Sequence, residues 1–472
     1  MIVLRGILGD LSQIRCSEAS VTNNDAEVKA IAFYLPQYHP NPENDEWWGK
    51  GFTEWRNVAK ARPNFEAHYQ PHAPGDLGFY DLRIAEVMEA QAALAKEYGL
   101  YGFCFYHYWF NGRQVLDLPL KKFLANPKAD IPFCLCWANE NWTRRWDGAD
   151  HEILLGQNHN IDDDEAFIRH LLPIFEDPRY IKVAGKPMLL VYRVDLFPDS
   201  KATAALWRRI AKEAGYPDLH LCAVQFYGVT DPAPWGFDAA VEFPPHTFLT
   251  KDNLPIETPQ KINPNWNGGI FDYLRVAADA ITRKTADYLW YRGVMPSWDN
   301  TARRQDTSHI FWNSSPAHYN FWLRKIVDQT ARRLEPNQRF VFINAWNEWG
   351  EGCHLEPDLK YGHAYLEATR NALHGITTID AALTALQAEG SLIDNKIAAE
   401  ISDRVTGMER SLLAFHNELR RKSDELHFAW KMHEEARNQI MLQAHGSRRL
   451  VRSILNRFPR FKRLLKKLLG RP

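Results

Sequence analysis

The sequence predicts an α/β fold, a (β/α)8 TIM barrel with a C-terminal helical extension. Eight short apolar or β-branched runs, each ending in polar and aromatic residues, are mostly followed by helix-like segments. They occupy roughly 330 residues, within the range of about 200 to more than 400 that such barrels span. A doubly wound open sheet is the competing fold.

The strands are expected where apolar β-formers run together between turn residues. They begin, in order, at Ala30, Tyr101, Ile131, Pro187, Leu219, Phe237, Tyr291 and Arg339. Amphipathic stretches lie between several of them, for example residues 81–99 and 204–218, and each closes on a glycine as a helix C-cap does. This alternation of strand and helix is the pattern of the barrel.

Composition limits the class of protein. The chain has 472 residues, of which 45% are hydrophobic, so it can bury one large core and still carry appendages. Its net charge is -1, but residues 447–472 carry ten Arg or Lys and no acid, which leaves -11 for residues 1–446. We therefore expect no nucleic-acid partner for the main domain.

We divide the chain into an N-terminal extension (1–28), a catalytic barrel (29–376), a helical region (377–446) and a basic amphipathic tail (447–472). The tail suits an anionic membrane surface, and a helix packed on the barrel or on a partner is the alternative. No apolar run reaches transmembrane length, and Arg5 and Asp10 interrupt the only signal-like start. We expect a cytoplasmic protein, peripheral at the inner membrane, with six reduced cysteines.

The strongest chemical signal is "NAWNEWGEGCHLEPD" at 344–358, just past the last predicted strand. Glu348 and Glu351 can face one site if the chain turns after Trp349, as Gly350 and Gly352 permit. Burial against tryptophan raises one carboxyl pKa while exposure keeps the other carboxylate ionised. We expect both carboxyl groups in one cleft, roughly 5 to 9 Å apart, as an acid and base for an acetal carbon. A solvated acidic loop is the alternative.

Polar and aromatic side chains gather at the other strand ends, where barrel chemistry is found. Aromatic faces suit the C–H patches of sugar rings, and amides and acids suit their hydroxyls, although such aromatics also pack cores. The predicted substrate-binding residues are Tyr34, Gln37, His39, Trp55, His107, Tyr108, Trp137, Asn139, Glu140, Trp298, Asp299, Asn347 and His354. The ends that carry His39, His107, Trp137, Asn139 and Trp298 should converge on one cleft.

Two further groups of residues are candidate binding sites. His39 and His107 lack a third metal ligand at suggestive spacing, so we expect hydrogen-bonding histidines, no metal and no other cofactor. Arg303 and Arg304 in "PSWDNTARR" either hold anionic groups or form a surface loop with salt bridges.

Six motifs in order, from "FYLPQYHP", "GFTEW", "YQPHAPGDLGFYDL", "FCFYHYWF" and "CWANENWTRRWDG" to "NAWNEWGEGCHLEPD", give the chain a family resemblance. It resembles the WbsX-type proteins of bacterial surface-polysaccharide gene clusters, commonly labelled glycosyltransferases. These are similar to glycoside hydrolase family 99, the endo-α-1,2-mannosidases and mannanases. The resemblance spans about residues 29–377.

The resemblance implies a (β/α)8 barrel with a metal-independent, retaining mechanism. In that mechanism Glu348 assists attack by the sugar's own 2-hydroxyl and Glu351 is the general acid/base. Gly350 departs from the hydrolases, which have a bulkier residue at that position.

The resemblance and the residues together predict a carbohydrate-active enzyme for an α-linked, mannose-like glycan in O-antigen, lipopolysaccharide or capsule biosynthesis. It would act by transfer or by hydrolysis. The expected partners are a glycan or lipid-linked oligosaccharide, and an anionic membrane through residues 447–472. The alternative is a non-catalytic glycan-binding or scaffolding protein at the membrane surface.

Overall fold

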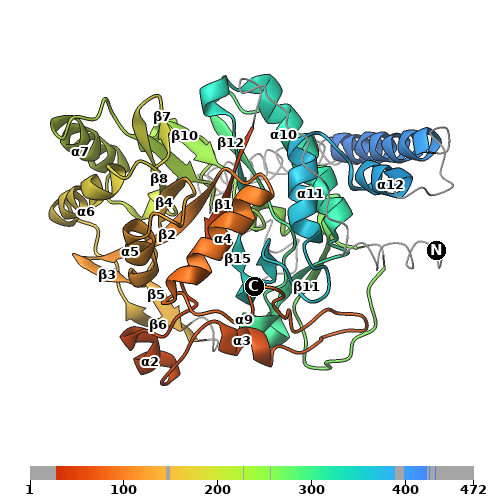
Figure 1. Cartoon of the computed structure of the whole chain (residues 1–472), viewed down its shortest axis with the longest axis horizontal. Helices are drawn as coiled ribbons and strands as arrows, with labels where there is room; N and C mark the ends of the chain where they lie inside the picture. The colour runs from red at the N-terminus through yellow and green to blue at the C-terminus, as the bar shows by residue number, and fades with distance from the viewer. Residues whose placement is uncertain are drawn as a thin grey trace, which may run out of the picture. The chain divides into compact units, whose positions relative to one another are not determined.

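The structure, a computed structural model, describes residues 28–144, 149–226, 228–255, 257–388 and 398–422, with 425 and 431. Eight parallel strands form a closed barrel inside a layer of helices (Figure 1). In chain order they are β1 (Lys29–Tyr34), β2 (Gly102–Phe110), β4 (Phe133–Trp137), β8 (Lys186–Val191), β9 (His220–Val224), β10 (Ala239–Val241), β12 (Trp290–Val294) and β14 (Phe340–Ile343).

Pairing around the barrel follows the chain and then closes on itself. Each strand pairs in parallel with the next, β14 pairs with β1 at Ala30 and Val341, and β1 pairs with β2 at Ile31 and Gly102. All eight predicted strands are present, so the barrel prediction is confirmed and the open sheet is wrong. The strands read as continuous apolar runs because helices cover the outer face and side chains fill the interior.

Several helices around the strands begin at a side-chain N-cap, which the sequence analysis did not predict. Asn160, Asp199 and Ser315 precede three of them, and each side chain accepts a hydrogen bond from a backbone N–H of the first turn. The principal helices of this layer are α4 (Ala85–Glu97), α5 (Leu118–Ala125), α6 (Ile161–Phe175), α7 (Ser200–Glu213), α8 (Tyr273–Thr282), α10 (Pro316–Arg333) and α11 (Ala364–Leu373).

Aromatic side chains fill two layers of the core. Inside the barrel the Phe33 ring contacts the rings of Tyr106, Phe243 and Phe342. Between β4 and the outer helices Trp137 lies 4.0 Å from Phe167, measured between ring centroids. Burial of these large rings is the main stabilising contribution of such cores.

Insertions after the strands build the end of the barrel that carries the site. The shorter elements are α2 (Pro42–Trp48), α3 (Trp55–Lys60), β3 (Arg113–Val115), β5 (Trp142–Arg144), β6 (Ala149–Leu155), β7 (Lys182–Val183), β11 (Gly269–Asp272), α9 (Thr301–Arg304), β13 (His309–Trp312), β15 (Asn347–Glu348) and β16 (Cys353–His354). Four of them matter most for the chemistry: α3, α9 and the hairpin β15–β16.

Among the described residues, the compact unit that holds the barrel ends at Val405 and a second unit begins at Thr406. Helix α12 (Thr378–Ala388), at the start of the predicted helical region, contacts α10 and α11 and belongs to the first unit. The domain boundaries expected from the sequence stay predictions. In the second unit residues 406–422 are helical. The extension 1–27 and the tail 447–472 lie outside the described residues.

Two further expectations concern thiols and membranes. Five cysteines are buried and free, as predicted, and Cys16 lies outside the described part of the chain. Among the helices that the structure describes, none has the length and apolar character needed to cross a bilayer.

Candidate functional site

A cavity of about 490 Å³ lies at the carboxyl ends of the barrel strands. Every one of the eight strands supplies at least one lining residue near or just after its end: Leu35, Tyr108, Ala138, Tyr192, Phe226, Phe243, Trp298 and Glu348. This is the face on which barrel enzymes carry their chemistry. The cavity is therefore the first candidate for a catalytic site.

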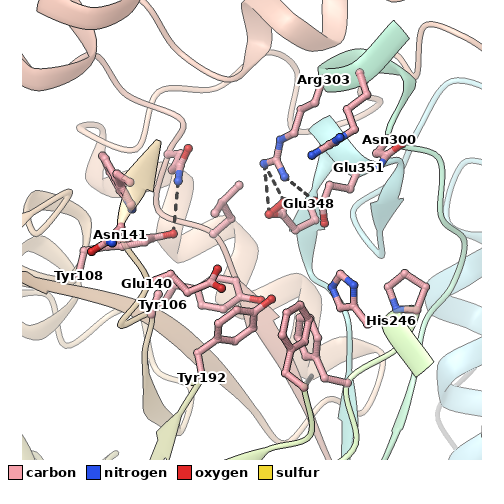
Figure 2. A pocket seen from close by; sticks show the side chains of 18 of the residues that line it. Tyr106, Tyr108, Glu140, Asn141, Tyr192, His246, Asn300, Arg303, Glu348 and Glu351 are labelled. Carbon is pink, nitrogen blue, oxygen red and sulfur yellow. Dashed lines mark hydrogen bonds and ion pairs between the residues drawn. The ribbon is translucent and has the colours of Figure 1, made fainter. Parts of the chain in front are cut away.

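One guanidinium binds three carboxylates at the edge of this cavity. Arg303 on α9 places Nη1 2.7 Å from Glu351, Nη2 3.1 Å from Glu348, and Nε 3.1 Å from Glu54. Figure 2 shows Arg303 pointing down onto Glu348, with Glu351 beside it. Because Glu348 and Glu351 share one planar group, their bound oxygens lie within roughly 8 Å of each other.

Glu54 was missed by the sequence analysis although its motif, "GFTEW", was singled out. It precedes α3, its side chain is 0% exposed, and it also accepts a hydrogen bond from Asn57. A buried carboxylate needs a paired charge, and Arg303 supplies it. Nothing local in the sequence marks Glu54 as a partner of Arg303, because 249 positions separate them.

The absence of a side chain at Gly350 leaves room for this ion cluster. A Cβ built on Gly350 would lie 2.4 Å from Glu54 Oε1 and 2.9 Å from Arg303 Nε, closer than real Cβ contacts. The Glu54–Arg303 pair thus occupies the volume that a larger residue between the two glutamates would take.

Both glutamates that face the cavity have raised carboxyl pKa values. Burial is the main cause that raises the pKa of Glu348 to about 8; the Glu351 and Glu54 charges add to this effect and Arg303 opposes it. Burial also raises the pKa of Glu351, again opposed by Arg303. Since one arginine cannot neutralise three buried carboxylates, the cluster retains a proton at neutral pH.

The turn that carries the glutamates is fixed to the end of β1. Asn347 Oδ1 accepts from the Leu35 backbone N–H at 2.7 Å, and its Nδ2 donates to the Leu35 carbonyl at 3.0 Å. The Tyr38 hydroxyl accepts from the Trp349 backbone N–H. These contacts hold Glu348 at the cavity edge and leave little freedom for the turn.

Aromatic side chains line much of the remaining cavity. Tyr106 and Tyr192 lie across it from Arg303 (Figure 2), and neither was predicted as a site residue. Tyr108 accepts a hydrogen bond from Gln37 and packs edge-on against Trp142. Rings combined with amide and carboxylate groups are what a sugar chain requires.

Six of the predicted site residues line this cavity, both glutamates among them. The others are Gln37, Tyr108, Glu140 and Trp298, with Glu140 paired to Arg193. The catalytic roles and substrate contacts of these residues stay predictions.

The structure corrects the expected convergence of strand ends. His107 faces outward onto His170 and Phe167, and Trp137 packs on Phe167, because alternate residues of a strand point to opposite faces. Of the five residues expected to converge, only Trp298 lines the cavity. Those that line neither described cavity are Tyr34, His39, Trp55, His107, Trp137, Asn139 and Asn347.

Two of these buried residues still serve the site indirectly. Asn347 positions the turn that carries Glu348 and Glu351, and Asn139 accepts from the Arg193 backbone N–H and donates to its carbonyl. Trp55 contacts Trp349 and Tyr38 rather than the cavity. They are structural supports for the cavity wall.

A second cavity, of about 280 Å³, shares Trp298 with the first. Predicted site residues Asp299 and His354 line this second cavity instead of the first. Asp299 accepts hydrogen bonds from His68 and Gln70 at 2.6 Å. The segment 298–300 and the turn after β15 form the wall between the two cavities. Consecutive residues of this wall point into different cavities: Asn300 and Glu351 line the first, and Asp299 and Gly352 line the second.

Replacing Gly350 by alanine should disrupt the ion cluster. The new methyl group displaces Glu54 or Arg303, and the unpaired buried charge costs about 3 to 5 kcal/mol if nothing relaxes. We expect a lower midpoint of thermal unfolding by calorimetry. Gly156→Ala is the matched control, since a Cβ there meets only ordinary contacts. Equal stability of both variants contradicts the close packing around Gly350.

Replacing Asn347 by alanine should destabilise the turn by about 2 to 4 kcal/mol, because two backbone groups of Leu35 lose their partner in a buried place. Urea unfolding of the variant measures this change in free energy. Asn158→Ala is the control, because Asn158 is exposed. If the free energy of unfolding falls no more than in the control variant, the turn does not depend on Asn347 for its stability.

Comparison with known proteins gives the family. A family model described as "Glycosyltransferase WbsX" matches residues 30–369. Two relatives, each called "Uncharacterized protein WxcX", come from Xanthomonas campestris pv. campestris. The protein of strain B100 is 50% identical over 343 residues, which cover 73% of this chain and 49% of the relative. That of strain ATCC 33913 is 49% identical with the same coverage. This chain thus spans about half the length of the curated relatives it matches.

Solved structures with a similar fold have much lower identity. A "Glycoside hydrolase-like protein" has 15% identity and a TM-score of 0.47, over 76% of this chain and 97% of its own. A GH99 endo-α-mannosidase from Bacteroides thetaiotaomicron has 14% identity and a TM-score of 0.45, over 77% and 100%. The family match covers most of the barrel and all the motifs of its site, and on that evidence the chain belongs to the WbsX glycosyltransferase family.

Proposed function

We propose that this protein is a carbohydrate-active enzyme that transfers or hydrolyses an α-linked, mannose-like glycan. Its place would be the biosynthesis of a bacterial surface polysaccharide, such as O-antigen, lipopolysaccharide or capsule. The observation that carries the proposal is the pair of Glu348, which is buried, and Glu351, which is partly exposed, both held by Arg303 beside an aromatic cavity. Two carboxyl groups that share a proton are the means by which proteins cleave or form acetal bonds.

We assign the roles that the resemblance implies, with Glu348 assisting the sugar 2-hydroxyl and Glu351 as general acid/base. In the ligand-free site the pKa of Glu348 is about 8, so the shared proton rests on Glu348 at neutral pH. A sugar hydroxyl that donates to Glu348 favours its ionised form, and a glycosidic oxygen that accepts from Glu351 favours the protonated form. Substrate binding therefore shifts the proton from Glu348 to Glu351, ready for the leaving oxygen.

Transfer and hydrolysis then differ only in what intercepts the activated sugar. In the first half, Glu351 gives its proton to the leaving oxygen as the 2-hydroxyl oxygen attacks the anomeric carbon and Glu348 takes the hydroxyl proton. In the second half, the oxygen of water or of an acceptor hydroxyl attacks the same carbon and gives its proton to Glu351. The bond between that carbon and the sugar's 2-oxygen breaks at the same time, and Glu348 returns its proton to the 2-oxygen. The aromatic residues around the cavity orient the rings throughout.

A non-catalytic glycan-binding or scaffolding protein is the second candidate. One observation favours it: both glutamates are ion-paired to Arg303, which suits a permanent structural cluster. Contact of residues 447–472 with an anionic membrane, and a cytoplasmic location at the inner membrane, belong to either function and stay predictions.

Glu348→Gln and Glu351→Gln should each lower turnover by roughly 10²- to 10⁴-fold, the usual contribution of a general acid or base. The assay is mass spectrometry of products from free and lipid-linked α-mannose oligosaccharides, with and without nucleotide sugars. Glu66→Gln is the control, because Glu66 is exposed and outside both cavities. Full activity of both Gln variants contradicts the proposed catalytic roles. Product formation that needs a nucleotide sugar assigns transfer.

The pH dependence of kcat/KM should have an alkaline limb near pH 8. The pKa of Glu348 is raised from 4.5 to about 8, so the cluster keeps its proton below that pH and loses it as the pH rises. Arg303 lowers this pKa, and Arg303→Gln should therefore move the limb to higher pH. A limb that does not move in the variant contradicts the shared-proton mechanism.

A further inference from the structure

Three buried residues that the proposed chemistry does not use meet at the second cavity. They are His72, which follows α3 in the "YQPH" segment, His354 in β16, and Asp358 just beyond it. One ligand atom from each lies within 4.8 Å of the others. We propose that these three side chains bind a divalent transition-metal cation of the zinc type, and that this ion fixes the hairpin behind the catalytic turn.

Each of the two histidines presents one ring nitrogen to the same point. His354 Nδ1 donates to the Glu356 carbonyl at 3.0 Å, which leaves Nε2 as a lone-pair donor. That nitrogen lies 2.9 Å from His72 Nδ1. A metal-binding histidine characteristically has its other nitrogen held by a carbonyl or carboxylate, as His354 does.

Asp358 supplies the charge. It is only 4% exposed, and its Oδ1 accepts from the backbone N–H groups of Lys360 and Tyr361. In the part of the chain that the structure describes, no Lys, Arg or His forms an ion pair with it, and the Lys360 ammonium lies over the rings of Tyr69 and Tyr361. A buried carboxylate without a cationic partner calls for a cation.

A direct hydrogen bond between the histidines accounts for their contact when no ion is bound. His72 Nδ1 then donates to His354 Nε2. Binding an ion requires His72 to carry its proton on Nε2 instead, so the imidazole stays neutral and no net proton is released. The two nitrogens, 2.9 Å apart, also have to separate slightly, and any ligand atoms near the 4.8 Å limit have to approach each other. Zinc bonds of roughly 2.0 to 2.2 Å in a tetrahedral arrangement place two ligand atoms about 3.3 to 3.6 Å apart.

The donor set decides the class of ion. Two imidazole nitrogens and one carboxylate oxygen suit zinc and its neighbours, whereas calcium and magnesium prefer oxygen ligands throughout. The cavity reaches all three residues, so ions can enter and water can complete the coordination.

The ion would be structural, because the turn lies between it and the acid/base pair. His354 stacks on Trp349 with ring centroids 3.7 Å apart, and Trp349 directly follows Glu348. A link from His72 to His354 and Asp358 ties two segments 282 residues apart at the back of this turn. No step of the glycosidic reaction passes through the ion, so the inference does not rest on the proposed function.

The test uses the full-length chain, stripped of metal with a chelator and titrated with zinc chloride and then cobalt chloride. We expect one equivalent of zinc by calorimetry, a higher midpoint of thermal unfolding on binding, and visible cobalt absorption typical of few-ligand nitrogen and oxygen coordination. His72→Gln and Asp358→Asn should each weaken binding at least about tenfold.

Asp358→Asn is the conservative variant, because its amide oxygen can still accept from the Lys360 and Tyr361 backbone and keep the loop folded. His318→Gln is the matched control, since His318 is a partly exposed histidine outside both cavities. The inference is overturned if the wild-type chain takes up neither metal, or if Asp358→Asn binds zinc as tightly as the wild type. In that case the three residues form only a hydrogen-bonded cluster.

Discussion

The binding of three carboxylates by one guanidinium is the constraint on which the site depends. Arg303 draws Glu54, Glu348 and Glu351 into a space that is largely closed to water. Removing charges from water is costly, and one positive charge offsets only part of that cost, so the cluster holds a proton that carboxyl groups in water would have lost. Desolvation of the charges is therefore unfavourable for stability. The same desolvation keeps a proton on the cluster near neutral pH, so that the cluster can act as an acid. Gly350 is part of this arrangement, since a side chain there would occupy the place of the ion pair.

The barrel makes this cluster possible by bringing distant segments to one end. Glu54 follows β1, Arg303 follows β12, and Glu348 follows β14, so the three come from the loops of neighbouring strands. Strand β1 lies between β14 and β2 in the closed sheet, and Asn347 binds the backbone just beyond β1. The closure of the barrel therefore fixes the turn as well as the cavity. A less rigid scaffold would let the buried charges separate and take up water.

The two cavities divide the polar residues of this face by chemistry. The first has carboxyl groups, arginine and tyrosines, which suit a sugar chain and proton transfer. The second gathers His72, His354 and Asp358, which suit a cation, around the back of the same turn. Trp298 belongs to both, so a change on one side of this wall is transmitted to the other through packed side chains. This arrangement separates the proposed acid/base pair from the proposed cation site.

The sequence by itself determined the eight strands, because buried parallel strands read as apolar runs whatever their neighbours are. It also located Glu348 and Glu351, since chemistry in a barrel gathers where strands end and glycines allow a turn. It did not determine which neighbouring side chain faces the cavity: Tyr106 and Tyr108 point inward while His107 points outward, and a shift of one residue in register reverses such an assignment. Nor did it pair Glu54 with Arg303 or His72 with Asp358. Those contacts join segments more than 200 positions apart, and only the closed barrel, by placing their loops at one end, decides that they meet.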